Sequence, residues 1–119
     1  PKHTLVLGAS ENPARYSYMA INRLRQEGHP VRAVGRKHAI VSDVPIETET
    51  KDWMDIHTVT LYLSREHQQQ YHDYILSLKP DRIIFNPGAE NQELEKLAKQ
   101  KGIETMNACT LVMLSTGQY

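Results

Sequence analysis

The segment at residues 8–17 contains the residue types that proteins use to bind an anion. It follows an apolar run and begins with Gly8, which permits a sharp turn. A helix starting just after the turn would direct free backbone N–H groups and the positive end of its dipole at a ligand. The side chains that add donors or positive charge are Ser10, Asn12, Arg15 and Ser17. The pattern predicts a phosphate-binding loop; the alternative is that Gly8 only makes a turn and Ser17 only caps a helix.

A second basic turn, Gly35-Arg36-Lys37, follows another apolar run. In nucleotide-binding sheets the end of the second strand meets the adenosine ribose, and NAD-specific sites place an acidic residue there. Cations in its place suit a ribose that carries a phosphate, as in NADP or coenzyme A. The alternative is a solvated basic turn. The glycine-rich dinucleotide fingerprint is incomplete, since residues 8–17 lack its second and third glycines, and the lysine-bearing P-loop pattern is absent too.

A third turn, at residues 86–91, begins with Asn86-Pro87-Gly88; its Asn86, Gly88 and Asn91 are residue types that turn chains and offer amide groups to a ligand. Its alternative role is the start of a helix capped by Glu90 or Asn91.

No catalytic or metal-binding set stands out in the sequence. His67 and His72 are five residues apart on one expected helix, so they fall on different faces and no metal site is expected. Cys109 follows the last expected strand, near the expected ligand site, and is interpreted as a bystander thiol. The alternative is a nucleophile, which would need a base or a helix end to lower the pKa of the thiol. No serine, histidine and carboxylate arrangement can be assigned.

The turns are placed by alternating strands and helices. Strands are expected at residues 3–8, 30–35, 58–63, 82–86 and 103–107, and helices at residues 17–27, 65–78, 91–101 and 110–114. This alternation predicts an α/β fold: a three-layer, doubly wound, Rossmann-type sheet of five to six mostly parallel strands, forming one domain over residues 1–119. Residues 38–55 are the least periodic, with a short edge strand expected near Ile46. The carboxyl ends of such strands carry the ligand site.

The amino-acid composition indicates which classes of binding partner are not expected. The 14 basic residues balance the 14 acidic residues, so neither nucleic acid nor an anionic membrane surface is an expected partner. No apolar run approaches the length of a bilayer span and no leader pattern is seen, which predicts a soluble, cytoplasmic protein. The single cysteine excludes an internal disulfide. A homodimer is the default expectation for a small protein of this kind.

The turns taken together resemble those of the small stand-alone CoA-binding domain family, which is similar to the CoA-binding domain of the succinyl-CoA synthetase α subunit. The residues that carry the resemblance are Gly8-Ala9-Ser10, Asn12-Pro13, Arg15-Tyr16-Ser17, Asn86-Pro87-Gly88, Glu90-Asn91 and Cys109-Thr110-Leu111-Val112, near Ser115-Thr116-Gly117-Gln118. The catalytic histidine of the larger synthetase belongs to a part that this chain lacks, so the resemblance implies no ligase activity.

The resemblance also implies where the parts of coenzyme A bind. The pyrophosphate is expected on Gly8, Ala9, Ser10 and Arg15, with Asn12, Pro13 and Ser17 shaping the loop; the adenosine 3′-phosphate is expected at Arg36 and Lys37; and the pantetheine arm is expected past Leu63, Ser64, Pro87 and Gly88. The family commonly has proline where this chain has Gly35-Arg36 before the lysine.

Three functions fit these residues. The first is a non-catalytic binder, sensor or carrier of coenzyme A or an acyl-CoA. The second is a small enzyme subunit that uses NADP or another nucleotide cofactor. The third is a protein-interaction module that keeps the fold without the ligand.

Overall fold

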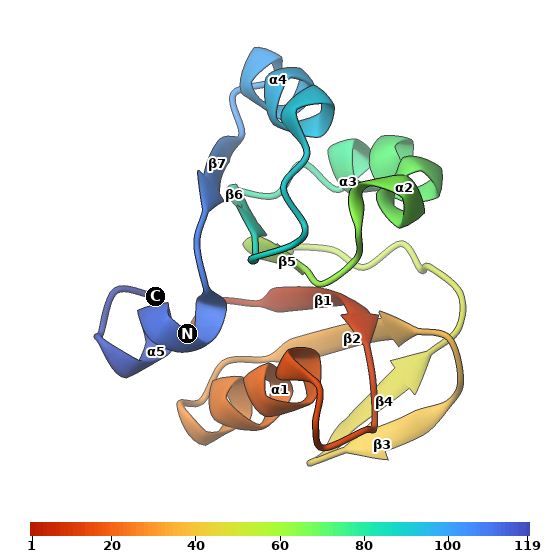
Figure 1. Ribbon diagram of the computed structural model, residues 1–119, viewed down its shortest axis with the longest axis vertical. Helices are drawn as coiled ribbons and strands as arrows, with labels where there is room; N and C mark the ends of the chain where they lie inside the picture. The colour runs from red at the N-terminus through yellow and green to blue at the C-terminus, as the bar shows by residue number, and fades with distance from the viewer.

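The computed structural model describes residues 1–119, in which strands and helices alternate along most of the chain (Figure 1). The strands are β1 (Thr4–Ala9), β2 (Val31–Gly35), β3 (Ala39–Val41), β4 (Val44–Glu47), β5 (Thr58–Leu61), β6 (Arg82–Phe85) and β7 (Glu104–Asn107). The helices are α1 (Tyr16–Gln26), α2 (Arg65–Gln68), the 3-10 turn η1 (Gln69–Tyr71), α3 (His72–Ser77), α4 (Gln92–Gln100) and α5 (Thr110–Ser115). None of these helices has the length and hydropathy needed to cross a bilayer.

All seven strands form one sheet in the order β3-β4-β2-β1-β5-β6-β7. Every pair of neighbours is parallel except β3 and β4, which are antiparallel. From β1 the chain adds β2 on one side, and it later returns to add β5 on the other side. The order of strands therefore reverses between β1 and β5, which is where open parallel sheets bind ligands, outside the carboxyl ends of the strands.

The expected doubly wound α/β sheet is confirmed, but the expected count of five to six strands is wrong. The difference is the β3–β4 hairpin, whose strands have three and four residues and are too short to produce a readable alternation. Ser42, with a φ of 57°, lies in the tight turn between Val41 and Val44, which pair directly. The strand expected near Ile46 is β4, and it lies inside the sheet because β3 forms the edge.

Two hydrophobic cores lie on opposite faces of the sheet. The larger contains 14 buried residues and packs against α3 and α4, and the smaller contains nine and packs against α1 and α5. Strand β1 supplies both, because successive side chains alternate: Leu5 and Leu7 enter the larger core and Val6 the smaller one. This is the three-layer arrangement expected from the sequence. The helix expected over residues 65–78 is instead broken into α2, η1 and α3.

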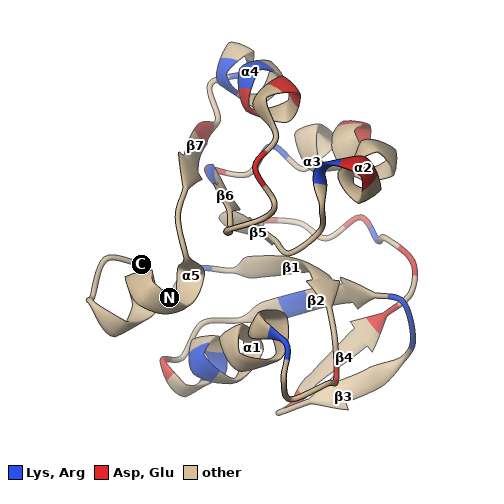
Figure 2. Ribbon diagram, in the orientation of Figure 1, with Lys and Arg blue, Asp and Glu red and all other residues tan.

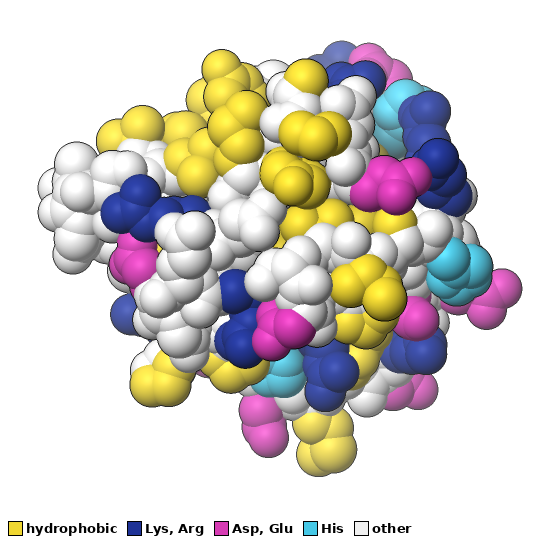
Figure 3. Space-filling model, turned by 90° about the horizontal axis from the view of Figure 1, so that it is seen from below, with side chains coloured by type: hydrophobic (Ala, Val, Ile, Leu, Met, Phe, Trp, Pro, Cys, Tyr) yellow, Lys and Arg dark blue, Asp and Glu magenta, His cyan; other side chains and the backbone are white.

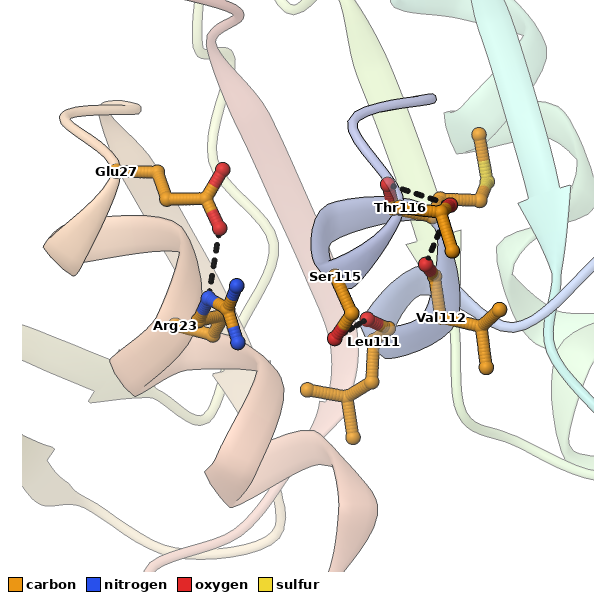
Figure 4. Close-up of polar contacts among 7 residues, drawn as sticks. Arg23, Glu27, Leu111, Val112, Ser115 and Thr116 are labelled. Atoms are coloured by element: carbon orange, nitrogen blue, oxygen red, sulfur yellow. Dashed lines mark hydrogen bonds and ion pairs between the residues drawn. The ribbon is translucent and has the colours of Figure 1, made fainter.

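Helices α1 and α5 lie side by side over the smaller core (Figure 4). In α1, Arg23 forms an ion pair of 2.6 Å with Glu27, one turn further along the helix. In α5, the hydroxyl of Ser115 donates to the carbonyl of Leu111 at 2.9 Å. The hydroxyl of Thr116 donates to the carbonyl of Val112 at 2.8 Å, which helps to end the helix. The chain then turns back toward the start of β1.

Tyr119 closes the structure at the amino ends of the strands. Its hydroxyl shares a hydrogen bond with the hydroxyl of Thr4, the first residue of β1. Its ring lies 4.3 Å from the guanidinium carbon of Arg82, which is buried at the start of β6 and donates to the Thr58 hydroxyl at 2.8 Å. A cation over an aromatic ring is attracted by the ring quadrupole, so Tyr119 partly compensates a buried charge that no carboxylate pairs.

Three histidines at this end make stability depend on pH. Burial is the main cause that lowers the pKa values of His3, His29 and His57 below the usual 6.5. In His29, Nδ1 accepts a hydrogen bond of 2.9 Å from the Lys2 N–H, which requires that nitrogen to be unprotonated. A lowered folded-state pKa means that the unfolded chain binds protons more readily. The stability from the neutral rings is therefore present above pH 6.5 and is lost as pH falls through the folded-state values.

We expect the melting temperature to decrease as pH is lowered from about 7.5 to about 5, measured by circular dichroism. The variant His29→Asn keeps an acceptor near the position of Nδ1 but cannot titrate, so its melting temperature should decrease less steeply over the same interval. A wild-type melting temperature that stays level or rises on acidification would contradict this account.

Candidate functional site at the carboxyl ends of the strands

Two glycines let the strand ends approach closely at the point where the strand order reverses. Gly8 has a φ of 92°, and a Cβ atom there would lie 2.9 Å from the carbonyl oxygen of Tyr62. A Cβ atom on Gly35 would lie only 2.2 Å from the carbonyl oxygen of Ala9. The β1–β2 register also shifts between Leu7 and Ala9. The ends of β1, β2 and β5 are therefore in close contact, and glycine is required at both places.

The loop after β1 is held by its own side chains. The Asn12 N–H donates to Oγ of Ser10 at 3.0 Å, and the Ala14 N–H donates to Oδ1 of Asn12 at 3.0 Å. The Arg15 N–H donates to the Asn12 carbonyl at 3.0 Å. Asn12 therefore fixes the turn from its backbone and its side chain together, and this agrees with the shaping role expected for it.

Helix α1 begins without a side-chain cap. Its N-cap residue is Arg15, in an extended conformation, and no side chain accepts from the first turn. The N–H groups of Tyr16, Ser17 and Tyr18 have no acceptor in the protein. Ser17 is buried inside the helix, so the alternative role of Ser17 as the cap is wrong. Three free N–H groups and the positive end of an 11-residue helix make an anion-binding position.

Exposed positive side chains belong to the loop after β1 and to the turn after β2. Arg15 precedes α1, and Arg36 and Lys37 follow β2; all three are exposed, and they appear as blue segments in Figure 2. Nζ of Lys37 lies 2.8 Å from Oε1 of Glu11, which belongs to the loop after β1. The hydrogen bond and charge of Glu11 raise the pKa of Lys37 above its usual 10.5. The turn at residues 35–37 and the loop after β1 are therefore joined by one ion pair.

The positive charge is local. On the face shown in Figure 3, basic and acidic side chains are interspersed, with hydrophobic and uncharged side chains among them. This agrees with the zero net charge of the sequence.

The turn at residues 86–91 has two structural functions. Pro87 and Gly88, with a φ of 90° at Gly88, form a turn closed by the Ala89 N–H donating to the Asn86 carbonyl at 2.8 Å. The side chain of Asn91 then caps α4 by accepting from the Leu94 N–H at 3.1 Å. The expected helix start with Asn91 as its cap is therefore confirmed.

Asn86 lies below this turn and faces the protein interior. Its side-chain amide donates to Oγ1 of Thr60 at 2.7 Å and to the Leu61 carbonyl at 3.0 Å. Its oxygen accepts from the Thr110 N–H at 2.9 Å. Asn86 is almost fully buried, so the structure gives it a supporting position beneath the site, and exposed Pro87 and Gly88 form the surface.

Gln68 is a functional residue that sequence reasoning missed. Its side chain is completely buried, and its amide donates to the Leu63 carbonyl at 2.8 Å and to the Ala89 carbonyl at 2.7 Å. Its oxygen accepts from the amide of Asn91 at 2.9 Å. Gln68 therefore joins the loop after β5 to the loop after β6. No sequence signal could have found it, because a glutamine on a helix is ordinarily solvated.

The remaining polar groups at this end are half-buried or exposed. Oγ of Ser64 lies 3.1 Å from Nδ1 of His67, an exposed residue. Burial raises the pKa of Tyr62 to about 12, so its hydroxyl stays protonated. That hydroxyl has no hydrogen-bond partner, whereas the hydroxyls of Thr60 and Thr110 bond to each other at 2.8 Å. Cys109 is half-buried at the start of α5, and no group of three metal-ligating side chains is found.

The comparison with protein families shows which family the chain belongs to. A family described as CoA binding domain matches residues 2–115, nearly the whole chain. The chain belongs to this CoA-binding domain family. The resemblance expected from the three turns is thereby confirmed, and no curated protein sequence matches the chain.

Solved structures include a relative of this CoA-binding domain. A crystal structure of a protein described only as uncharacterized has 47% sequence identity and a TM-score of 0.96, covering 99% of this chain and 98% of that one. A hypothetical protein from Pyrococcus horikoshii OT3 has 22% identity and a TM-score of 0.85, with 95% and 81% covered. A second P. horikoshii protein, PH0766, has 18% identity and a TM-score of 0.72, and the match covers 91% of this chain but 28% of that one. The last two share the fold.

One hollow of this CoA-binding domain lies away from the site. It is lined by residues at the amino ends of β6 and β7, namely Leu76, Lys79, Pro80, Asp81, Lys101, Gly102 and Ile103. It contains no free helix start, and Asp81 offsets its lysines. We therefore place the candidate site at the carboxyl-end loops, where the unpaired N–H groups and the exposed cations coincide.

Proposed function

We propose that the protein binds coenzyme A or an acyl-CoA through the loop after β1. The observation that carries the proposal is the start of α1, where the N–H groups of Tyr16, Ser17 and Tyr18 have no acceptor. A pyrophosphate supplies several acceptor oxygens and negative charge, and both are favoured at a helix N-terminus. Membership of the CoA-binding domain family supports the same ligand.

Arg36 and Lys37 support coenzyme A over ligands with an unmodified ribose. They follow Gly35 at the end of β2, beside the loop after β1. A phosphate on the adenosine ribose would meet both cations there, and guanidinium groups bind phosphate with charge-assisted hydrogen bonds. The pantetheine arm would then cross the sheet toward Ser64 and Gly88, where the loops joined by Gln68 form the surface.

We propose a non-catalytic role, as a cytoplasmic carrier or sensor. The buried amides of Gln68, Asn86 and Asn91 are engaged in internal hydrogen bonds, so they hold the loops in place. Ser64 and His67 form the one serine–histidine contact at this end, but His67 is exposed and no hydrogen bond from a carboxylate orients its ring. A general base needs such orientation to activate a nucleophile.

Titration calorimetry tests the proposal with four ligands: CoA, dephospho-CoA, NADP and NAD, in one buffer at one salt concentration. We expect CoA to bind most tightly. Tighter binding of NADP would favour a nucleotide-dependent enzyme subunit, and no heat with any of the four would leave a protein-interaction module as the best reading.

The variant Arg36→Ala separates the ribose phosphate from the rest of the ligand. We expect it to weaken CoA about tenfold, because a charge-assisted phosphate contact is lost, and to change dephospho-CoA binding less than about twofold. Lys96→Ala, which removes an exposed cation on α4, is the matched control and should leave both affinities unchanged. If Arg36→Ala lowered the affinities for CoA and dephospho-CoA equally, the 3′-phosphate would not bind at Arg36.

A further inference from the structure

Glu11 is the only acidic residue among the loop after β1 and the turn after β2. Its carboxylate lies 2.8 Å from Nζ of Lys37, and the same two segments carry the exposed Arg15 and Arg36, so an incoming anion would be favoured there. A carboxylate in that place opposes an anionic ligand unless it has a separate role. Its one ionic contact is Lys37, which belongs to the other loop, 26 positions along the chain.

The contact spans the space between two loops. Glu11 follows the end of β1, and Lys37 follows the end of β2. These strand ends are in close contact at Ala9 and Gly35. The bond of 2.8 Å therefore joins the two segments between which a ribose phosphate would bind under the proposed function. Both side chains are largely exposed, so solvent screens the pair and a ligand phosphate can displace it at small cost.

From this geometry we infer that Glu11 is a specificity-determining residue. Its carboxylate forms an ion pair with the Lys37 ammonium in the free protein, and a ligand that carries a ribose phosphate must break this ion pair to bind Lys37. The inference rests on the proposed function, because it concerns the ligand of the same site. A ligand with free ribose hydroxyls still carries its pyrophosphate but brings no ribose phosphate to Lys37, so it leaves the Glu11–Lys37 pair intact. Glu11 thus lowers the affinity for nucleotides that carry a ribose phosphate, and it leaves the affinity for nucleotides with free ribose hydroxyls unchanged.

The test compares wild type, Glu11→Gln, Lys37→Ala and the double variant by calorimetry with CoA and dephospho-CoA. Glu11→Gln should tighten CoA about two- to fivefold, because one competing charge is removed, and should change dephospho-CoA less than about twofold. In the Lys37→Ala background the same substitution should have no effect on CoA. Glu95→Gln is the matched control: it removes a carboxylate paired with Lys99 at 3.1 Å on α4, and it should change neither affinity.

A second measurement examines the pair without any ligand. Because Glu11 raises the pKa of Lys37, a titration of the Lys37 side chain by NMR should give a lower pKa in Glu11→Gln than in wild type. The inference is overturned if the two values agree, if Glu11→Gln tightens both ligands equally, or if its effect on CoA persists without Lys37.

The two proposals fail in different ways. If wild type binds CoA and Glu11→Gln binds it no more tightly, the role of Glu11 is wrong and the proposed function stands. If neither protein binds CoA or dephospho-CoA, both are wrong. Binding of CoA by Glu11→Gln alone would support the role of Glu11 and contradict the proposed function of the wild-type protein.

Discussion

Gly35→Ala is expected to lower the free energy of unfolding by about 3 kcal/mol, because the added methyl group has no space. Its Cβ would lie 2.2 Å from the Ala9 carbonyl oxygen and 3.0 Å from Cγ2 of Ile46. The first of these atoms is backbone and belongs to the central strand, so no rotamer change relieves the overlap. The ends of β1 and β2 would have to separate, and the loop after β1 would move with them. We therefore expect weaker CoA binding as well.

Urea unfolding followed by circular dichroism measures the loss of stability, and Gly28→Ala is its control. Gly28 has a φ of 84° but no atom within 4 Å of a Cβ position, so alanine there should cost only the backbone strain of about 1 kcal/mol. If Gly35→Ala is no less stable than Gly28→Ala, the close approach of β1 and β2 is not a constraint on the fold.

Gln68→Glu is expected to cost about 3 to 4 kcal/mol although it changes the shape of the side chain very little. The amide group of Gln68 donates to the carbonyl oxygens of Leu63 and Ala89, at 2.8 Å and 2.7 Å. In the variant a carboxylate oxygen would face two carbonyl oxygens in a fully buried position. Repulsion and desolvation both oppose that arrangement. The loops after β5 and β6 should separate, which urea unfolding would detect as reduced stability.

The pH dependence of the stability of Gln68→Glu provides a second test of the role of Gln68. A buried glutamate has a raised pKa in the folded state, so its destabilising effect should decrease as the pH falls and the carboxyl group gains a proton that it can donate. The difference in stability between wild type and Gln68→Glu at the same pH should therefore narrow on acidification. Gln69→Glu places the same charge on the exposed neighbouring residue and should cost little. Similar losses in the two variants would contradict the role given to Gln68.

The features predicted correctly from the sequence are those that local chemistry determines. An apolar run ending at Gly8, followed by a helical pattern, predicts a strand, a turn and a helix, and these are β1, the loop after it and α1. Asn91 was recognised as a helix cap because asparagine before a helical pattern is a local signal. The same reasoning failed for Ser17, since more than one polar residue could have started α1.

The features that were missed depend on contacts between distant segments. Strand β3 has three residues and gains its place by antiparallel pairing with β4, as between Ala39 and Ile46, which no local pattern reveals. The contacts of Gln68 with Ala89 and of Glu11 with Lys37 join segments 21 and 26 positions apart. A single sequence states the residue types at such positions, but only the folded chain shows which of them meet.

The first and last residues lie at the opposite end of the sheet from the candidate site. Lys2 and Tyr119 both lie beside the start of β1, with the Lys2 ammonium 5.9 Å from the centre of the Tyr119 ring. Strand β1 has six residues, so its length of roughly 20 Å separates them from the loops at its other end. A second domain fused next to Lys2 or Tyr119 would leave those loops exposed. The CoA-binding domain could also be inserted into a loop of a host protein, because the two points of connection would lie close together. The same geometry makes either terminus suitable for surface immobilisation with the candidate site facing the solution.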